Sequence, residues 1–426
     1  MKFDELAASF ERIEKMSSRL GMMHELGQVL KKAHAHEASI ICNISLGQLH
    51  PPYIGTQFNM AEKMVLKTIA QFLGHSDEVI AREAKAKGDV GVVVGLYEWK
   101  ATEDMTVLQV YKELCALEQA GGEGSQEGKV RMLKSLLEKL TPSSAKFVVR
   151  IVIGKLRLGF SDMTLVDALS WMETGDKSLR KKIEDAYNVC ADIGAIAQTL
   201  KEKGQKSLEH YAIHVGIPIL PAAAERLPSA ADIIKKLGHC VAQPKLDGFR
   251  LQVHYDHAKH MLKFFSRNLL DMTGMFPDLA KTFRSITGIK TLICEGEAIG
   301  YDANTDSFLP FQETVKRKRK HGVEQAATDA PLRLFLFDIL YLNGHSLLDD
   351  THEERRKKLL AVGKHFHSEN VQIIKEHPIT TAKQLQDYFL EMINMGLEGL
   401  VVKRPDAIYQ AGKRNFNWIK LKKEAE

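Results

Sequence analysis

The stretch that decides the fold class is KLDGFRLQVHY, which covers residues 245–255. Polar side chains at Arg250, Gln252 and His254 alternate with apolar neighbours, which is the period-two pattern of a strand with one buried face. Similar patterns follow at 261–265, 292–301, 332–341, 400–403 and 418–421, and helical patterns intervene at 277–285, 353–362 and 382–395. Strands and helices mixed in this way indicate an α+β domain.

The chain before this region has helical periodicity. Phe3, Leu6, Phe10 and Ile13 recur at three- and four-residue spacing and form one apolar stripe. Comparable patterns occupy 61–73, 129–140, 145–153 and 164–172. The sequence GIPILPAAAERL at 216–227 has two prolines and no clear period, which indicates a connector. We therefore predict a multidomain protein with an all-α domain at 1–215 and an α+β domain at 216–426.

Length and composition exclude several classes of protein. A chain of 426 residues with 44% hydrophobic and 27% charged residues is typical of a multidomain globular protein. No apolar run has the length of a membrane span, and the five scattered cysteines form no CxxC pair. We expect an intracellular monomer, in the cytoplasm or nucleoid, without a membrane partner. The net charge of +5 permits a nucleic-acid partner but does not require one.

Lys245 at the start of KLDGFR is a candidate nucleophile. A lysine ammonium is not nucleophilic, and the ordinary lysine pKa near 10.4 leaves only about one side chain in a thousand neutral at pH 7.4. Attack on phosphorus therefore needs a site that favours the neutral amine through burial or nearby cations. The plainer interpretation is a lysine–aspartate pair followed by a turn, and a short motif alone does not decide between the two.

The hexapeptide at 245–250 resembles the Lys-x-Asp-Gly-x-Arg signature of the nucleotidyltransferases, which include ATP-dependent DNA ligases, RNA ligases and mRNA capping enzymes. Further family motifs have similar sequences downstream, in the family's order. They are FSRN at 265–268, CEGE at 294–297, LFDILYLNG at 336–344, EGLVVK at 398–403, and GKR at 412–414 with WIKLK at 418–422. An ordered set of this kind is specific, although each motif alone is weak.

The resemblance implies roles for single residues. Lys245 becomes covalently attached to AMP, Glu398 implies a site for Mg²⁺ or Mn²⁺, and ATP is the nucleotide. The remaining nucleotide contacts that the resemblance implies are Gln243 on the adenine amine, Glu297 on the ribose hydroxyl, Phe337 stacked on adenine, Arg250 and Arg267 on ribose or phosphate, and Arg414, Lys420 and Lys422 on the phosphates.

These residue types suit the implied chemistry. Attack on an α-phosphate needs cations around the phosphoryl oxygens, and Mg²⁺ prefers a hard oxygen ligand such as Glu398. Taken singly, each residue has a plainer interpretation. Phe337 lies in an apolar strand and would be core, while Glu297 and Lys420 would be solvated strand residues. The order of the whole set favours the catalytic interpretation.

The helical half separates the branches of the superfamily. The sequence KLRLGFSDMTLVDAL at 155–169 is similar to a segment of the DNA-binding domain of archaeal and eukaryotic-type DNA ligases, and KGDVG at 87–91 also resembles that domain. The resemblance implies a nicked duplex DNA partner. Arg150, Lys155 and Arg157, with backbone amides near Gly159, are candidate phosphate contacts, and a solvated basic face is the alternative. Such binding is independent of sequence and strongly salt-dependent.

Three features depart from the family pattern or invite another interpretation. Gln243 stands where these ligases usually have glutamate, and a glutamine amide accepts through its oxygen but donates through its nitrogen. The family continues into an oligonucleotide-binding (OB-fold) barrel after the last motif, so we expect this sequence, which ends at Glu426, to lack that domain and to self-adenylate slowly. The run KRKRK at 316–320 could be a nuclear-localisation patch, but we predict an exposed basic helix near DNA.

The combined interpretation is an ATP-dependent DNA ligase with a helical DNA-binding domain and an α+β adenylation domain of the ATP-grasp-like nucleotidyltransferase type. It seals nicks through a lysine–AMP intermediate and an adenylated 5′-phosphate, and a sliding clamp is a conceivable partner. The alternatives are an RNA ligase or capping-type enzyme on the same core, and a catalytically silent DNA-binding fragment. The long helical half argues against the RNA enzymes.

Overall fold

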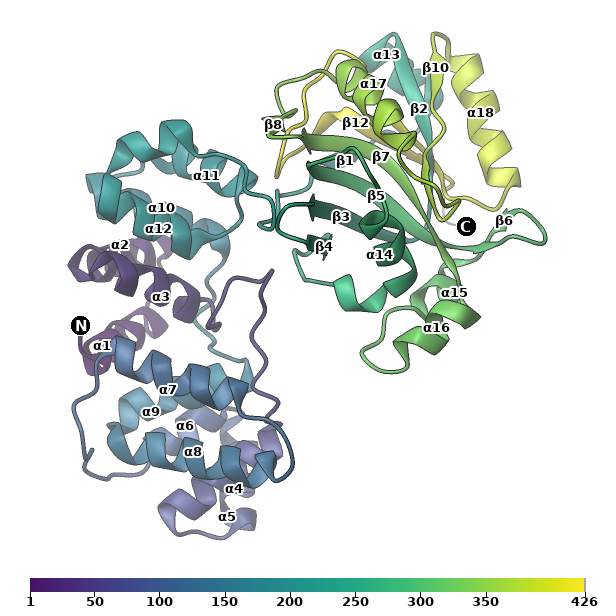
Figure 1. The fold of residues 1–426 in the computed structure, drawn as a ribbon. Coiled ribbons are helices and arrows are strands. Elements are labelled where there is room, and N and C mark those ends of the chain that lie inside the picture. Colours follow the sequence, from purple (N-terminus) through teal and green to yellow (C-terminus); the bar gives the residue numbers. More distant parts are fainter. Residues whose placement is uncertain (425–426) are drawn as a thin grey trace. The chain divides into compact units, whose positions relative to one another are not determined.

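The computed structural model describes residues 1–424. Within these residues the chain forms two compact units (Figure 1). We call Met1–Tyr187 with Ala191–Ala212 the helical unit, and Asn188–Cys190 with the residues from Ile213 onward the mixed unit. None of the helices in residues 1–424 is both long and apolar enough to cross a membrane.

The helical unit forms because its helices have apolar faces and well-defined ends. Phe3, Leu6, Phe10 and Ile13 are all buried on one side of the first helix. Thr141 caps another helix by accepting a hydrogen bond from the backbone N–H of Ser144. The helices of this unit are α1 (Phe3–Glu14), α2 (Arg19–Lys32), α3 (Ala35–Ser45), α4 (Glu62–Leu73), α5 (Asp77–Lys87), α6 (Val90–Gly95), α7 (Val107–Gln119), α8 (Ser125–Lys139), α9 (Pro142–Ile153), α10 (Asp162–Thr174), α11 (Arg180–Val189), α12 (Ile193–Lys203) and the 3₁₀ helix η1 (Gln205–His210).

The mixed unit contains two β-sheets. The first has the strand order β1-β12-β11-β2-β10, and the second has the order β4-β3-β5-β7-β8, with β6 paired to β5 and β9 paired to β7. The strands are β1 (Ala223–Arg226), β2 (Cys240–Lys245), β3 (Phe249–Asp256), β4 (Met261–Ser266), β5 (Thr291–Asp302), β6 (Ser307–Phe308), β7 (Leu332–Leu342), β8 (His345–Ser346), β9 (Val371–Ile373), β10 (His377–Ile379), β11 (Gly399–Lys403) and β12 (Arg414–Lys422).

The helices of the mixed unit cover one face of each sheet. Figure 1 shows α18 (Ala382–Asn394) beside β2 and β10, and its buried residues share a core with α13 (Ala230–Leu237) and the first sheet. In the second sheet, α14 (Pro277–Arg284) and α17 (His352–Gly363) contribute to the core that holds Val253 and Leu334. The 3₁₀ helix η2 (Thr273–Met275), α15 (Phe311–Val315) and α16 (Val323–Asp329) complete the unit.

This order confirms the predicted sequence of an all-helical region followed by an α+β region. The interpretation of 216–227 as a connector without regular structure is wrong in part, because Ala223–Arg226 forms β1. This strand pairs in parallel with β12, with Ala223 opposite Arg414. A partner so distant in sequence leaves no trace in local periodicity.

Candidate active site between the two sheets

One face of the first sheet gathers many of the residues selected from the sequence. Side chains on a strand alternate between faces, and directly paired residues of neighbouring strands share a face. The opposite face belongs to the core, where Ala242, Leu400 and Ile419 are buried. The site face has three cross-strand rows, which are Val241, Lys403 and Trp418; Gln243, Val401 and Lys420; and Lys245, Gly399 and Lys422.

Residues of the second sheet meet this face. The rings of Phe337 on β7 and Trp418 on β12 lie 6.1 Å apart between centroids, in an edge-to-face arrangement. The guanidinium of Arg250 on β3 lies 5.3 Å from the Phe337 ring centroid and 5.6 Å from that of Trp418. Glu297 on β5 pairs with Arg250 in the strand register. We call this meeting of the two sheets the inter-sheet site.

Lys245 forms an ion pair with Glu398. The Nζ of Lys422 lies 3.9 Å from the same carboxylate oxygen. Burial by itself would raise the pKa of Glu398, but the hydrogen bond and charge of Lys245, helped by Lys422 and Lys420, hold that pKa below its usual value. The attack by Lys245 that the sequence led us to expect therefore requires this ion pair to open.

Gly248 brings the chain after Lys245 close to the second sheet. A Cβ atom at this position would lie 2.1 Å from the carbonyl oxygen of Ala298, so only glycine fits. The Gly248 backbone N–H donates a 3.2 Å hydrogen bond to Glu297 Oε1. Burial raises the pKa of Glu297 to about 7, although the Arg250 charge and this hydrogen bond oppose the rise. The KLDG turn thus holds one carboxylate next to Lys245.

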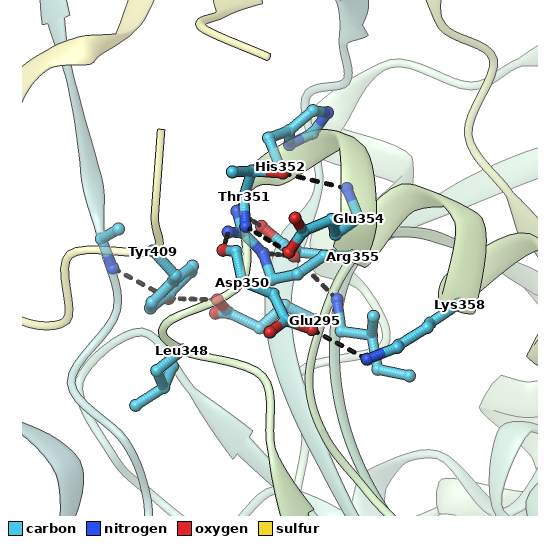
Figure 2. A network of polar contacts seen from close by, with 12 residues as sticks. Glu295, Leu348, Asp350, Thr351, His352, Glu354, Arg355, Lys358 and Tyr409 are labelled. Atoms are coloured by element: carbon cyan, nitrogen blue, oxygen red, sulfur yellow. Dashed lines mark hydrogen bonds and ion pairs between the residues drawn. The ribbon is translucent and has the colours of Figure 1, made fainter. Parts of the chain in front are cut away.

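Arg250 is fixed by the protein itself. Its Nε lies 3.1 Å from Glu295 Oε2, and its Nη1 donates to the carbonyl of Ala222 at 2.7 Å. Tyr409 donates to the same Glu295 carboxylate, and Figure 2 shows these two side chains pointing toward each other. Because most of its donors are used in this way, Arg250 braces the two sheets and presents a cationic plane to Phe337. The contact with ribose or phosphate that the sequence suggested for Arg250 stays a prediction.

The remaining predicted cations lie around Lys420. Burial lowers the pKa of Lys420, and the nearby charges of Arg414, Lys422, Lys245 and Arg267 lower it further. Arg267 is exposed just after the end of β4, and Arg414 is exposed at the start of β12. Cations that lower the pKa of Lys420 in this way are close enough to it to act together on one polyanion.

Lys403 is a site residue to which the sequence analysis gave no role. It is 1% exposed, its Nζ has no hydrogen-bond partner among the described residues, and burial lowers its pKa to about 8. The Nζ lies 4.0 Å from the Trp418 ring centroid and 4.7 Å from that of Phe337. The signal was present in the sequence, because strand alternation places residue 403 on the face of residue 401. An unpartnered buried donor beside an aromatic ring suits a ligand that stacks there and offers an acceptor.

The acidic groups suit a magnesium ion bound mainly through phosphates. Among residues 1–424, no cluster of three or more histidine, cysteine or acidic side chains could hold a metal by itself. Glu398 is ionised, and burial together with the Glu398 charge raises the pKa of the neighbouring Asp247. Mg²⁺ commonly keeps several waters and takes only one or two carboxylates alongside substrate phosphates. Glu398 fits that pattern.

Comparison with known proteins decides the family. Residues 221–422 match a sequence profile described as "ATP dependent DNA ligase domain", and residues 2–170 match one described as "DNA ligase N terminus". A "Probable DNA ligase" of Dictyoglomus thermophilum is 42% identical over 426 residues, which cover 99% of this chain and 72% of the relative. The chain belongs to the ATP-dependent DNA ligases. A "DNA ligase 2" of Thermofilum pendens is 37% identical, with 100% of this chain and 72% of the relative covered.

The fold of this ligase also has a counterpart among solved structures. The structure named Pmar-Lig_PreS3 matches with a TM-score of 0.54 over 98% of this chain and 78% of the other, at 18% identity. An identity this low supports the likeness of fold alone.

The DNA contacts predicted in the helical unit of the ligase divide into two groups, and Arg150 does not fit its predicted role. The Arg150 side chain is 2% exposed, with Nη2 2.6 Å from Asp89 Oδ2 and Nη1 2.7 Å from Glu14 Oε1. It packs so closely on Gly91 that a Cβ atom there would lie 2.8 Å from its side chain. A buried, doubly paired guanidinium stabilises the helical unit and is not available to a phosphate.

Lys155, Arg157 and Gly159 lie on the exposed turn that follows α9. Arg157 has a φ of 62° and donates through Nη2 to the carbonyl of Gly88 at 2.8 Å. Gly159 has a φ of 70°, a conformation that favours glycine. The segment 87–91 thus contacts both the buried Arg150, through Asp89, and the exposed turn, through the Gly88 carbonyl.

The predicted basic helix at 316–320 is also wrong. Helix α15 ends at Val315, and the run continues as a turn. Arg317 within it is fully buried, with Nη2 2.6 Å from Asp278 Oδ1 and Nη1 donating to the Ala330 carbonyl at 3.0 Å. The run was therefore not uniformly exposed, because one of its five basic residues, Arg317, has a structural role in the interior.

Proposed function

We propose that this chain seals nicks in duplex DNA with ATP, and that Lys245 is the nucleophile that takes up AMP. The proposal is supported by four residues that meet in the inter-sheet site: Lys245, Glu297, Phe337 and Glu398. They come from strands of both sheets or from positions next to those strands. These residues have the types that hold a base, a ribose, a metal ion and a nucleophilic amine. Their positions in the sequence are far apart, so a common site is not a consequence of local structure.

In the proposed first step, Lys245 attacks the α-phosphate of ATP and pyrophosphate leaves. Phe337 stacks on adenine, Glu297 accepts from the ribose, and Lys403 donates to the base. Lys420, Lys422, Arg414 and Arg267 stabilise the phosphate charge that builds up in the transition state. Glu398 would hold Mg²⁺, and the ion would supply positive charge to neutralise the phosphates.

The ion pair between Lys245 and Glu398 gives this step an order. While Lys245 is paired with Glu398, its Nζ is not free to attack phosphorus. Once Glu398 turns away, Lys245 is left beside the cations Lys420 and Lys422. We infer that nucleotide binding turns Glu398 away and frees the nucleophile.

The later steps use the same site. AMP passes from Lys245 to the 5′-phosphate at the nick, and the 3′-hydroxyl then attacks that phosphate and releases AMP. Adenylation turns a poor leaving group into a good one, which is the reason for the covalent intermediate. In the helical unit, Lys155, Arg157 and the amides near Gly159 contact DNA phosphates without recognising the base sequence.

The cellular setting is part of the proposal. No disulfide bond is found among residues 1–424 and four of the five cysteines are buried, which suits a reducing intracellular compartment. We take the ligase to act as a monomer on its DNA, which light scattering with and without a nicked duplex can test.

The test separates the last step from the first. A nicked DNA duplex that already has AMP on its 5′-phosphate is incubated with the chain and Mg²⁺, beside matched nicked RNA and diphosphate-ended RNA. We expect sealing of the adenylated DNA and of neither RNA. Glu398→Ala is expected to reduce this sealing at least tenfold, and Glu369→Ala, which changes an exposed glutamate, serves as the control. Failure of the wild-type chain to seal the adenylated DNA would contradict the proposal.

A further inference from the structure

Gln243 stands on the face of β2 that also bears Lys245, at the position where the resembled ligases have glutamate. Its side chain is 2% exposed, so its polar atoms can be reached only by a group that enters the inter-sheet site. A glutamate there can only accept hydrogen bonds. A glutamine presents either an acceptor or a donor, and adenine and guanine need opposite ones, because adenine offers an amine where guanine has a carbonyl.

Glu376 decides which end of the Gln243 amide faces the site. It immediately precedes β10, whose His377 pairs with Ala242 of β2. The Gln243 Nε2 donates to Glu376 Oε1 at 3.0 Å. Among residues 1–424, no hydrogen bond to the Gln243 side-chain oxygen is found, so the oxygen is the end left for a ligand.

The surroundings keep Glu376 ionised. Its Oε1 lies 2.6 Å from His352 Nε2, and its Oε2 lies 3.7 Å from Arg356 Nε. Burial alone would raise the pKa of Glu376, but His352, Arg356 and the Gln243 hydrogen bond bring that pKa below its usual value. A carboxylate has no hydrogen to donate, so it can receive only the NH₂ end of the amide. A reversed amide would set two acceptor oxygens against each other in a buried position.

We propose that Glu376 is a positioning residue for nucleotide selection, which holds the Gln243 oxygen toward the base so that the site accepts the amine of adenine and rejects the carbonyl of guanine. The inference rests on the proposed function. Because Glu376 takes the NH₂ group of Gln243, Gln243 presents only its oxygen to the base. It therefore acts as an acceptor, as glutamate does in the resembled ligases.

A counterintuitive prediction concerns the residue that is usual in the family. Gln243→Glu would place a second carboxylate at hydrogen-bond distance from Glu376, where like charges cannot both be ionised without cost. We therefore expect Gln243→Glu alone to bind ATP more weakly than the wild type. The double variant Gln243→Glu with Glu376→Gln exchanges the two side chains, so that the pair again has one carboxylate and one amide. We expect this variant to bind ATP as well as the wild type does.

The experiment measures equilibrium binding of the α,β-methylene analogues of ATP and GTP to the whole chain, so that no covalent step intervenes. We expect the wild type to prefer the adenine analogue by roughly tenfold or more, because a misdirected buried polar group costs about that factor. Glu376→Gln should reduce this preference to about threefold or less, since a glutamine at 376 lets the amide turn. Glu369→Gln, at a side chain 86% exposed, is the control and should leave the preference unchanged.

The outcomes separate this inference from the proposed function. A Glu376→Gln variant that melts like the wild type and keeps the full adenine preference overturns the inference and leaves the ligase assignment intact. If Glu376→Gln does not fold, the double variant decides: recovery of the adenine preference supports the inference, and a preference no better than that of Gln243→Glu overturns it. A wild-type chain that binds neither analogue overturns the proposed function, and this inference with it.

Discussion

The inter-sheet site and the helical unit each combine basic residues that have acidic partners with basic residues that have none among the described residues. In the inter-sheet site, Lys420 lies among cations that lower its pKa, and it has no acidic partner in an ion pair among the described residues. In the helical unit, Arg150 is buried between Asp89 and Glu14, while Lys155 lies exposed on the turn that follows the same helix. A buried, matched charge supports the fold, whereas an unmatched charge is available to a ligand. Residue type alone does not make this distinction.

The largest effect is expected when a buried arginine with two acidic partners is removed. Arg150→Ala leaves Asp89 and Glu14 near an empty buried space, so we expect a loss of about 3–5 kcal/mol in the free energy of unfolding of the helical unit. Urea unfolding followed by circular dichroism measures it. Lys155→Ala, on the turn after the same helix, should change stability by less than about 0.5 kcal/mol. If Arg150→Ala had normal stability but bound DNA weakly, the result would contradict this account and support the phosphate contact predicted from the sequence.

The next effect concerns the aromatic ring that the cations of the inter-sheet site surround. Phe337→Ala removes the proposed stacking surface, and base stacking on an aromatic side chain is worth about 1–3 kcal/mol, or roughly fivefold to 150-fold in ATP affinity. Calorimetric titration with ATP measures the change. Phe311→Ala, at a partly exposed ring of the same unit, is the control and should bind ATP normally. Equal ATP affinity of Phe337→Ala and the wild type would show that the ring is core and not a platform.

A smaller effect tests the unmatched charges of the helical unit. Removing one basic side chain that neutralises a DNA phosphate reduces the slope of log affinity against log salt by about 0.9. We expect Lys155→Ala and Arg157→Ala each to lower the slope for nicked duplex DNA by about that amount, without a change in melting temperature. Lys203→Ala, at an exposed lysine of the same unit, should leave the slope as it is. Unchanged slopes in Lys155→Ala and Arg157→Ala would show that these two residues do not contact DNA phosphates.

The smallest effect follows from the raised pKa of Glu297. Because its folded pKa of about 7 exceeds the ordinary value of 4.5, the native state binds this proton more tightly than the unfolded chain. Its contribution to stability is complete below pH 4.5 and is lost as the pH rises through 7. Glu297→Gln removes that loss, so we expect it to stabilise the protein at pH 8 relative to pH 5 by on the order of 1 kcal/mol. A pH-independent effect in calorimetric melting would contradict the burial of this carboxylate.

Strong local periodicity made the main strands and helices predictable. The alternation at 249–255 became β3, and the helical pattern at 145–153 became part of α9. Strand β2 was missed because it is short and contains Pro244, and its neighbours in the sheet are remote in sequence. Lys245 was therefore expected before a strand, whereas it ends one and precedes another.

The candidate site was predictable as a set of residue types but not as a set of contacts. The ordered motifs selected Lys245, Glu297 and Glu398, and the structure places them near one another. The ion pair of Lys245 and the internal hydrogen bonds of Arg250 depend on which side chains face each other across two sheets. Lys403 was overlooked because strand alternation predicts the face on which residue 403 lies, but not that its Nζ is buried without a hydrogen-bond partner among the described residues.

The most direct test of the central claim is the site of covalent labelling. The chain is incubated with ATP and Mg²⁺, digested, and its peptides are analysed by mass spectrometry, beside Lys245→Ala and the surface control Lys263→Ala. We predict one added AMP on Lys245 in the wild type and in Lys263→Ala, and none in Lys245→Ala, a loss of at least about a thousandfold for removal of a nucleophile. AMP attached to another lysine, or retained in Lys245→Ala, would contradict the claim.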